Sequence, residues 1–566
     1  MDSEYDFIVV GGGTSGLVLA ARLTEDPSTS ILVVEAGSEH TNDPRIRTPA
    51  FWLSVLGSAK FDLDYKTKGL DGRVIPLSQG KLLGGSSAIN GLSFVANSKA
   101  AVDAWAGFGN PGWDWETLEP YYKRFHTLAS PSAAASEHLR LSYVAESIHG
   151  RDGPVRASFP EESSDPLPSA WVDTIGALGY TASGDPFSGK FSGGYINALS
   201  VDPVSRTRSD AATAYFEPAK SRPNLHVVTD ALADKILFDT TGAVPNAMGS
   251  PKLLELSGIG NRALLKSLNI PIVVENSNVG ENLQDHPVSS VSFEVEDGVK
   301  TIDALARQEP EAVGAAMQEY MTHKSGPFAV GNFTGSLLPV VDFVGPKGQA
   351  TLEQLLSQIK ASNMDIIAGD FTPYHTSFVH SLLQNPAEAV GNVFMYAACA
   401  NVNPAQAGAD IIVKEASQTP ASYVTICAAL CYPLSRGSTH ITSSNPNDKP
   451  IIDPRYLEHP LDLEVQARFL RYAETIVRNL SDLEVAKQYA KLSALSCWHP
   501  TSTCAMLPRE RGGVVNPRLC VYGVEGLRVV DSSIIPLATR GNTQMTVYAV
   551  AERAADLIKQ DYGLGN

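Results

Sequence analysis

The chain has 566 residues, of which 43% are hydrophobic and 19% charged, and this composition excludes disordered and fibrous proteins. Its formal net charge of −17 argues against a nucleic-acid partner, because phosphate binding depends on clustered Lys and Arg side chains. No apolar run reaches the roughly 18 residues that a membrane span requires. Acidic residues precede the first apolar run, where a secretory signal would be basic, so we expect a soluble, cytoplasmic protein of two or more domains.

The six cysteines are spread over the second half of the chain. Their spacing does not match that of a metal site, so we expect no metal and interpret them as small buried side chains. A reducing compartment is consistent with this pattern.

The first 37 residues form the clearest local unit. Two apolar runs, Phe7–Val10 and Ile31–Val34, flank a glycine-rich turn and a helical stretch that reaches Leu23. Continuous apolar runs are typical of parallel strands that helices cover on both faces. The segment therefore predicts a right-handed strand-helix-strand unit.

Residues 11–16 read GGGTSG, directly after the first strand. Gly11 permits a tight turn, Gly13 lets the backbone approach a diphosphate, and Gly16 allows the helix to pack closely. Glu35 ends the second strand, where a carboxylate can accept hydrogen bonds from a ribose. A glycine turn without a ligand is the alternative, but strand, glycines, helix, strand and acid in order favour a dinucleotide site. The motif does not by itself separate NAD from FAD.

The remaining elements are less sharply marked. A helix is expected at 115–125 and a flexible surface connection at 128–137, in the segment LASPSAAASE. After Thr546, apolar side chains at helical spacing predict a final amphipathic helix.

Several ordered blocks extend over more than 500 residues: 80–90 (GKLLGGSSAIN), 249–260 (GSPKLLELSGIG), 279–286 (VGENLQDH) and 526–536 (GLRVVDSSIIP). Together with the amino-terminal motif, they resemble the glucose-methanol-choline (GMC) family of flavin oxidoreductases, in particular aryl-alcohol oxidases and fungal enzymes similar to choline dehydrogenase. The resemblance implies an α/β fold with a doubly wound, Rossmann-like FAD-binding domain built from discontinuous segments. It also implies a substrate domain with an antiparallel sheet flanked by helices. On this basis we expect the FAD domain at 1–160, 206–290 and 491–566, and the substrate domain at 161–205 and 291–490.

The resemblance also implies which residues bind FAD. The ADP half would contact Gly11, Gly13, Thr14, Ser15, Gly16, Glu35 and Ala36, with adenine near Ala233. The flavin ring and the ribityl and diphosphate groups next to it would contact Gly84, Ser87, Asn90, Gly91, Asp531, Ser532, Thr543 and Met545. Segment 84–100 contains no histidine, where some relatives attach FAD covalently, so we expect non-covalent FAD.

By the same resemblance, His499 falls at the catalytic histidine of the family and Asn542 at its histidine-or-asparagine partner. A base of this kind suits alcohol oxidation, because imidazole titrates near neutral pH. A satisfied core histidine is the alternative for any single histidine. His286 beside Asp285 suggests an acid-base pair, but its block favours a structural role.

One segment departs from the family. Roughly 30 to 40 residues expected before Gly249 are missing near 239–248, more than an ordinary loop variation. Loss of a central parallel strand would expose a sheet edge. Weaker FAD binding, a local rearrangement and an imperfect gene model all remain open.

The sequence thus predicts FAD-dependent oxidation of an alcohol to an aldehyde or ketone by hydride transfer. We expect the substrate to be a small aromatic or apolar primary alcohol and the role to lie in secondary metabolism. Oxygen or another electron carrier would accept the electrons from the reduced flavin. The sequence contains no pattern that indicates the oligomeric state. Two alternatives stand beside this prediction: a hydroxynitrile-lyase-like enzyme with FAD, and a GMC-fold protein with impaired FAD binding and no activity.

Overall fold

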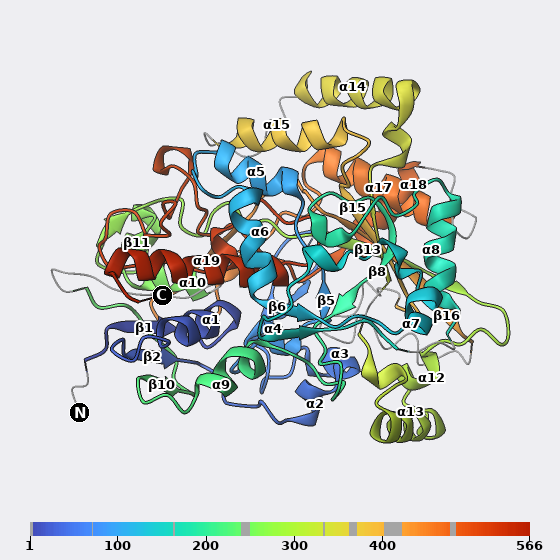
Figure 1. Ribbon diagram of the computed structural model, residues 1–566. Helices are drawn as coiled ribbons and strands as arrows, with labels where there is room; N and C mark the ends of the chain where they lie inside the picture. The colour runs from blue at the N-terminus through green and yellow to red at the C-terminus, as the bar shows by residue number, and fades with distance from the viewer. Residues whose placement is uncertain are drawn as a thin grey trace.

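The computed structural model describes residues 4–70, 72–161, 165–238, 249–331, 334–361, 371–400, 421–475 and 483–565. A small parallel sheet near the amino terminus and a larger antiparallel sheet lie in different parts of the molecule, with the carboxy-terminal helix running between them (Figure 1). Among the described residues, no helix combines the length and apolarity needed to cross a bilayer.

The parallel sheet has the order β1-β2-β10 and is built from Phe7–Val10, Ile31–Val34 and Leu225–Val228. Helix α1, Thr14–Leu23, connects β1 to β2. The predicted strand-helix-strand unit is confirmed, and Ile31 and Val33 are fully buried in it, as a strand between two neighbours requires.

Strand β1 is an edge of this sheet, because β2 is its only partner among the described strands. Ile8 on β1 is 38% exposed, which is unusual for a strand of this composition. Loss of a strand next to β1 would leave β1 as an edge of the sheet. The segment 239–248, where that loss is expected, lies outside the described residues.

The carboxy-terminal helix α19, Gln544–Tyr562, packs against α1 and against α6, Trp115–Arg124. The fully buried carboxylate of Glu552 fixes this packing, since it accepts hydrogen bonds from Arg22 of α1 and from Tyr215 and pairs with Arg124 of α6. The helix was expected to begin after Thr546 as its N-cap, but its N-cap is Thr543 and it begins three residues earlier than expected, at Gln544.

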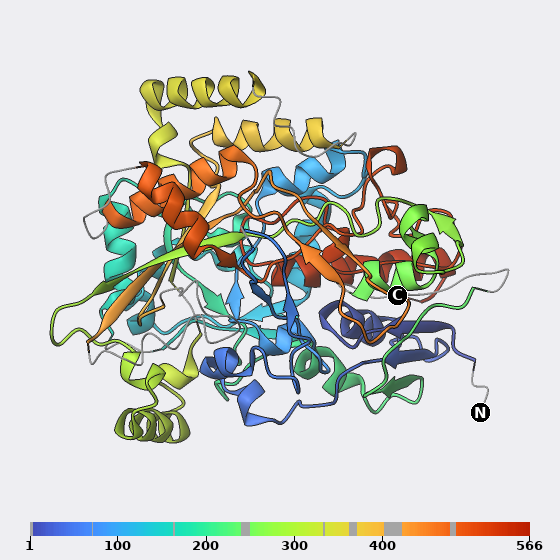
Figure 2. The same ribbon diagram turned by 180° about the vertical axis from the view of Figure 1, so that it is seen from behind.

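The antiparallel sheet has six strands in the order β19-β13-β16-β15-β14-β8. In chain order they are β8 Gly193–Ile196, β13 Pro287–Glu294, β14 Thr334–Leu338, β15 Gly391–Tyr396, β16 Tyr423–Leu430 and β19 Leu495–Ser496. Figure 2 shows the long strands of this sheet from behind, beside the orange helices. The expected α/β architecture, with a Rossmann-like part and an antiparallel sheet, is confirmed.

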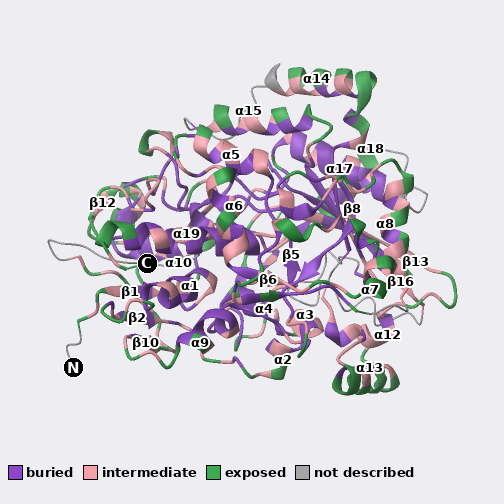
Figure 3. Ribbon diagram, viewed as in Figure 1, coloured by how far each residue is buried: buried purple, intermediate pink, exposed green. Residues whose placement is uncertain are grey.

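Helices α8 Leu167–Ala177 and α17 Pro460–Thr475 cover one face of the antiparallel sheet, and α14 Gly345–Ala361 and α15 Thr372–Leu383 add to the same hydrophobic core from outside. Because side chains alternate along a strand, Val393 and Met395 of β15 point into this core while Asn392 and Phe394 point to the other face. Figure 3 shows the buried residues concentrated in the centre of the molecule, whereas α14 and α13, Pro310–His323, carry many exposed ones.

One local prediction was wrong. The segment 128–137 was expected to be a flexible connection, but it contains helix α7, Ala133–His138. Ser132 caps this helix by accepting a hydrogen bond from the backbone N–H of Ala135. The Ser and Pro content that suggested a loop marks the start of a helix instead.

Candidate active site

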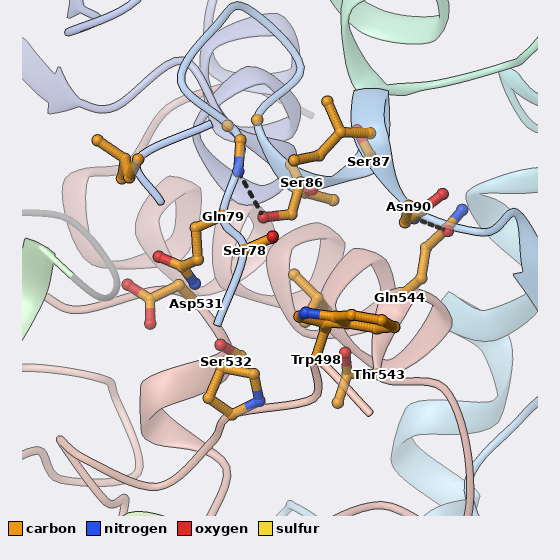
Figure 4. A pocket seen from close by; sticks show the side chains of 18 of the residues that line it. Ser78, Gln79, Ser86, Ser87, Asn90, Trp498, Asp531, Ser532, Thr543 and Gln544 are labelled. Carbon is orange, nitrogen blue, oxygen red and sulfur yellow. Dashed lines mark hydrogen bonds between the residues drawn. The ribbon is translucent and has the colours of Figure 1, made fainter. Parts of the chain in front are cut away.

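A cleft of about 410 Å³ lies between the glycine turn after β1 and the uncovered face of the antiparallel sheet. Its lining comes from both ends of the chain, as Figure 4 shows for residues around Ser78 to Asn90 and around Trp498 to Gln544. Of the residues predicted to bind FAD, those that line the cleft are Gly11, Gly13, Thr14, Ser15, Gly16, Glu35, Ala36, Ser87, Asn90, Gly91, Ala233, Asp531, Ser532 and Thr543; His499 and Asn542 line it too.

The glycine turn has room for a ligand at one position and none at another. Gly11 has a φ of +99°, which favours glycine. A Cβ on Gly16 would lie 2.0 Å from the carbonyl oxygen of Gly11, so α1 packs here without space for a side chain. A Cβ on Gly13 would meet no protein atom closer than 3.9 Å. The open space beside Gly13, at the start of α1, suits a diphosphate.

Glu35 lines the cleft beside the glycine turn. Its carboxylate accepts hydrogen bonds from the backbone N–H groups of Gly12, at 2.8 Å, and Gly37, at 2.7 Å. Burial raises the pKa of Glu35 to about 7 despite these bonds. A carboxylate held at this position can accept further hydrogen bonds from the hydroxyls of a ribose.

The cleft also contains hydrogen-bonding groups without protein partners. Asn90 donates from Nδ2 to Oε1 of Gln544, as the dashed line in Figure 4 marks. Ser15 Oγ, Gln544 Nε2 and Trp498 Nε1 are buried and make no hydrogen bond. Buried groups of this kind usually have a partner, so the cleft fits a polar cofactor that would provide one.

Asp531 is the buried acid at the middle of the cleft. It accepts hydrogen bonds from the backbone N–H of Ser533 at 2.7 Å and from Ser250 Oγ at 3.0 Å. Burial raises its pKa to about 6. Ser250 belongs to α10, Gly249–Leu256, so this contact joins the second glycine-rich block to the carboxy-terminal segment.

Two predicted cofactor residues do not line the cleft. Gly84 donates its N–H to the carbonyl of Gly12, and the next residue, Gly85, lies against Gly13 at the cleft surface. Met545 is fully buried in the hydrophobic core, because helical periodicity turns Gln544 and Val547 of α19 toward the cleft instead.

His499 and Asn542 lie together in the cleft, with His499 Nε2 3.0 Å from Asn542 Nδ2. An amide nitrogen only donates, so Nε2 of this imidazole accepts and carries no proton. The proton is on Nδ1, which lies 2.9 Å from Nδ1 of His286. Burial and the neighbouring His286 lower the pKa of His499 well below its usual value, so the ring is neutral with its lone pair facing Asn542.

Residues 5–249 match the amino-terminal domain of GMC oxidoreductases and residues 433–551 match their carboxy-terminal domain. The chain belongs to the GMC oxidoreductase family. Relatives include the dehydrogenase mpl7 of Monascus purpureus, 32% identical over all of this chain and 97% of its own length. Another is the GMC oxidoreductase family protein Mala s 12 of Malassezia sympodialis, 31% identical over 98% and 92%.

Solved structures agree with this assignment. An FAD-dependent oxidoreductase from Chaetomium thermophilum is 27% identical over 99% of this chain and 100% of its own, with a TM-score of 0.87. A fungal aryl-alcohol oxidase is 25% identical over the whole of both chains, with a TM-score of 0.84. Members of the family bind FAD, and the cleft of this GMC oxidoreductase lies where its own glycine turn, Glu35 and Asp531 would hold that cofactor.

A second layer of residues in this GMC oxidoreductase orients His499. Asp285 Oδ1 accepts hydrogen bonds from the backbone N–H groups of His499, at 2.9 Å, and His286, at 2.8 Å. Its other oxygen accepts from Ser496 Oγ at 2.5 Å and from the hydroxyl of Tyr456. Trp498, with a φ of +56°, turns the chain so that the next side chain enters the cleft.

The contacts of Asp285 and His286 are structural, as their sequence block favoured. They form no acid-base pair, since the ring of His286 contacts His499 and the carboxylate of Asp285 binds backbone N–H groups. Neither residue has a local signal that reveals this, because His499 is more than 200 positions away. Among the described residues, no group of three or more His, Cys, Asp or Glu side chains could hold a metal ion.

Proposed function

We propose that this GMC oxidoreductase oxidises an alcohol to an aldehyde or ketone, with non-covalent FAD, His499 as the base and Asn542 as its partner. The observation that carries the proposal is the lone pair of His499 Nε2, fixed 3.0 Å from the amide of Asn542 inside a cleft suited to FAD. Segment 84–100, which contributes Ser86, Ser87 and Asn90 to the cleft, has no histidine for a covalent link.

The chemistry follows from where the two side chains face. An alcohol oxygen that replaces their direct contact would accept a hydrogen bond from Asn542 Nδ2 and donate its proton to His499 Nε2. FAD, when bound, supplies the acceptor for the hydride that leaves the carbinol carbon. The alcohol therefore loses one proton to His499 and one hydride, and a carbonyl product remains. The amide of Asn542 holds the oxygen as negative charge develops on it.

An aromatic primary alcohol is the substrate class that we propose. Trp52, Phe394 and Trp498 line the cleft together with His499, and flat apolar walls suit an aromatic ring. An aryl-alcohol oxidase is among the similar structures, which supports the same class. We propose oxygen or another small carrier as the final acceptor.

The substitution His499→Ala tests the proposal directly. We expect anaerobic bleaching of the flavin by benzyl alcohol to slow by about 10²- to 10⁴-fold, because the base that takes the hydroxyl proton is gone. Rapid-mixing absorbance at the flavin band measures the rate, and the ratio of flavin to protein absorbance serves as the control for FAD content.

Rapid bleaching retained in His499→Ala would refute the assigned base. Wild-type holoenzyme that no alcohol bleaches, but that releases an aldehyde from a cyanohydrin, would instead indicate a lyase.

A further inference from the structure

A fully buried arginine bonds to residues of the cleft wall without lining the cleft itself. The guanidinium of Arg208 donates from Nε to the carbonyl of Ile46 at 3.0 Å and from Nη1 to that of Ser87 at 3.2 Å. Burial lowers the pKa of Arg208 to about 10, so the group keeps its positive charge at neutral pH. Arg208 is therefore a buried cation at the border of the cleft.

The charge of Arg208 is only partly compensated by the protein. Its hydrogen-bond partners among the described residues are all uncharged oxygens, and its Nη2 is buried without a partner. Asp210 acts on it through its charge, but the carboxylate of Asp210 accepts from the backbone N–H and the hydroxyl of Thr213 instead. A buried charge usually has a partner of opposite charge. Negative charge on a ligand in the cleft would provide part of that compensation.

A chain of hydrogen bonds leads from Arg208 into the cleft. Arg208 Nη1 donates to Asn90 Oδ1 at 2.8 Å, and the backbone N–H of Leu92 donates to the same oxygen at 3.1 Å. Because both of these groups can only donate, they fix the orientation of the Asn90 amide, with its Nδ2 toward Gln544. Asn90 Nδ2 donates to Gln544 Oε1, as Figure 4 shows.

The orientation of the Gln544 amide follows in turn. Its Oε1 bonds to Asn90, so Nε2 is the free branch of the amide, and this nitrogen is buried without a protein partner. Asn90 and Gln544 both line the cleft. The chain that begins at a cation therefore ends at an unused N–H donor beside the cofactor cleft. Hydrogen bonds in such a chain polarise one another, so the charge of Arg208 strengthens this donor.

We propose that Arg208 is a positioning residue that acts on bound FAD through Asn90 and Gln544 and raises its reduction potential. A flavin that takes up a hydride gains one hydrogen and one negative charge, and a polarised N–H donor stabilises the added charge. This role rests on the proposed function in one respect, since FAD must occupy the cleft. It does not depend on which alcohol is oxidised.

The reduction potential of bound FAD tests this role in Gln544→Leu, Arg208→Met and the double variant. Reduction by xanthine and xanthine oxidase beside a reference dye measures the potential without any alcohol. In each single variant we expect reduced FAD to bind about tenfold more weakly relative to oxidised FAD, which lowers the potential by about 30 mV. The double variant should shift little further, because both changes interrupt the same chain.

Arg206→Met is the matched control for the arginine variant. Arg206 is also buried, with 5% of its surface exposed, but it donates to Ser158 Oγ and to the carbonyl of Phe159, and neither of these residues lines the cleft. Both arginine variants lose one buried positive charge and its hydrogen bonds. We expect Arg206→Met to keep the wild-type potential even where its folded state is less stable.

A wild-type potential in Gln544→Leu, an equal shift in Arg206→Met, or fully additive shifts in the double variant would each overturn the role of Arg208 and leave the proposed function standing. Alcohols that bleach no flavin, in a holoenzyme whose variants show the expected shifts, would overturn the proposed function alone. If Arg208→Met does not retain FAD, Arg208→Gln keeps a donor for Asn90 without the charge. Its potential should also fall, and a wild-type value would overturn the proposal.

Discussion

At the scale of single residues, the tautomer of His499 decides whether it can act as a base. With Asn542 Nδ2 donating to Nε2, the proton of the neutral ring is on Nδ1, which faces Nδ1 of His286 at 2.9 Å. His286 accepts at Nδ1, so its own proton is on Nε2. His286 is therefore a positioning residue, which acts on the alcohol through His499.

His286→Ala tests this arrangement. The variant leaves Nδ1–H of His499 buried without an acceptor, so we expect a rate of anaerobic flavin reduction at least about tenfold lower. His286→Asn should recover much of the rate, because an amide oxygen can accept the same hydrogen bond. Rapid mixing of both variants with benzyl alcohol provides the measurement, with FAD content as the control. Equal rates in the two variants would show that the hydrogen bond at Nδ1 does not matter.

At the scale of elements, two glycines of the turn between β1 and α1 should differ in their roles. One should affect the packing of α1, and the other only the binding of the cofactor. In Gly16→Ala the new Cβ would lie 2.0 Å from the backbone of Gly11, so α1 must move away from β1. In Gly13→Ala the new Cβ meets only open space, which the diphosphate of FAD would fill.

We expect Gly16→Ala to lower the thermal midpoint of the apoprotein and to lose FAD, and Gly13→Ala to lose FAD while its apoprotein keeps the wild-type midpoint. Calorimetry of the apoproteins and the flavin absorbance of the purified variants measure the two effects. A Gly13→Ala variant that retains full FAD would place the diphosphate elsewhere.

An ion pair connects α10 to β17, Ser438–His440. His440 bonds Glu255 at 2.6 Å and Glu281 at 3.2 Å. Burial alone lowers the pKa of His440, but the hydrogen bonds and charges of Glu255 and Glu281 outweigh it and raise the pKa to about 9. The pair therefore stabilises the fold fully below pH 6.5, and this stabilisation is lost as pH rises through about 9.

His440→Gln should be less stable than wild type by an amount on the order of 2 kcal/mol near pH 6.5, and the difference should shrink as pH rises past 9. Urea denaturation of both proteins over this range measures it. A difference that is constant with pH would mean that His440 is not charged in the folded protein.

At the scale of the whole molecule, the cleft joins segments that lie far apart in the chain. Its walls come from the glycine turn, from the loop around Ala233, and from the region of His499 to Val547. A cofactor that contacts all of them stabilises the folded state, because it binds only where they meet.

We expect FAD at a hundredfold excess over its dissociation constant to stabilise the apoprotein by about 2.7 kcal/mol, and so to raise its thermal midpoint. Scanning calorimetry of apoprotein with increasing FAD provides the measurement, with NAD at the same concentrations as the control. Colourless protein whose midpoint FAD does not change would favour the alternative of a GMC fold with impaired cofactor binding.

Much of the fold and part of the site could be predicted from the sequence. The limits of β1, α1 and β2 follow from the apolar runs and the glycines between them, because each of these signals is local. His499 and Asn542 were found through motif blocks, and the structure brings them together. Gly84 and Met545 do not line the cleft, because a block predicts a neighbourhood and not which residue faces the cleft.

The sequence by itself determined the glycine turn, the acid at position 35 and the positions of the histidine and asparagine, since these depend on residues near one another or on blocks that keep their order. Tertiary structure alone decided which tautomer His499 adopts and which polar groups lack a partner in the cleft. Contacts such as those of His286 with His499, or of Asn90 with Gln544, join residues more than 200 positions apart. No local pattern encodes such contacts, because only the packed chain brings these side chains together.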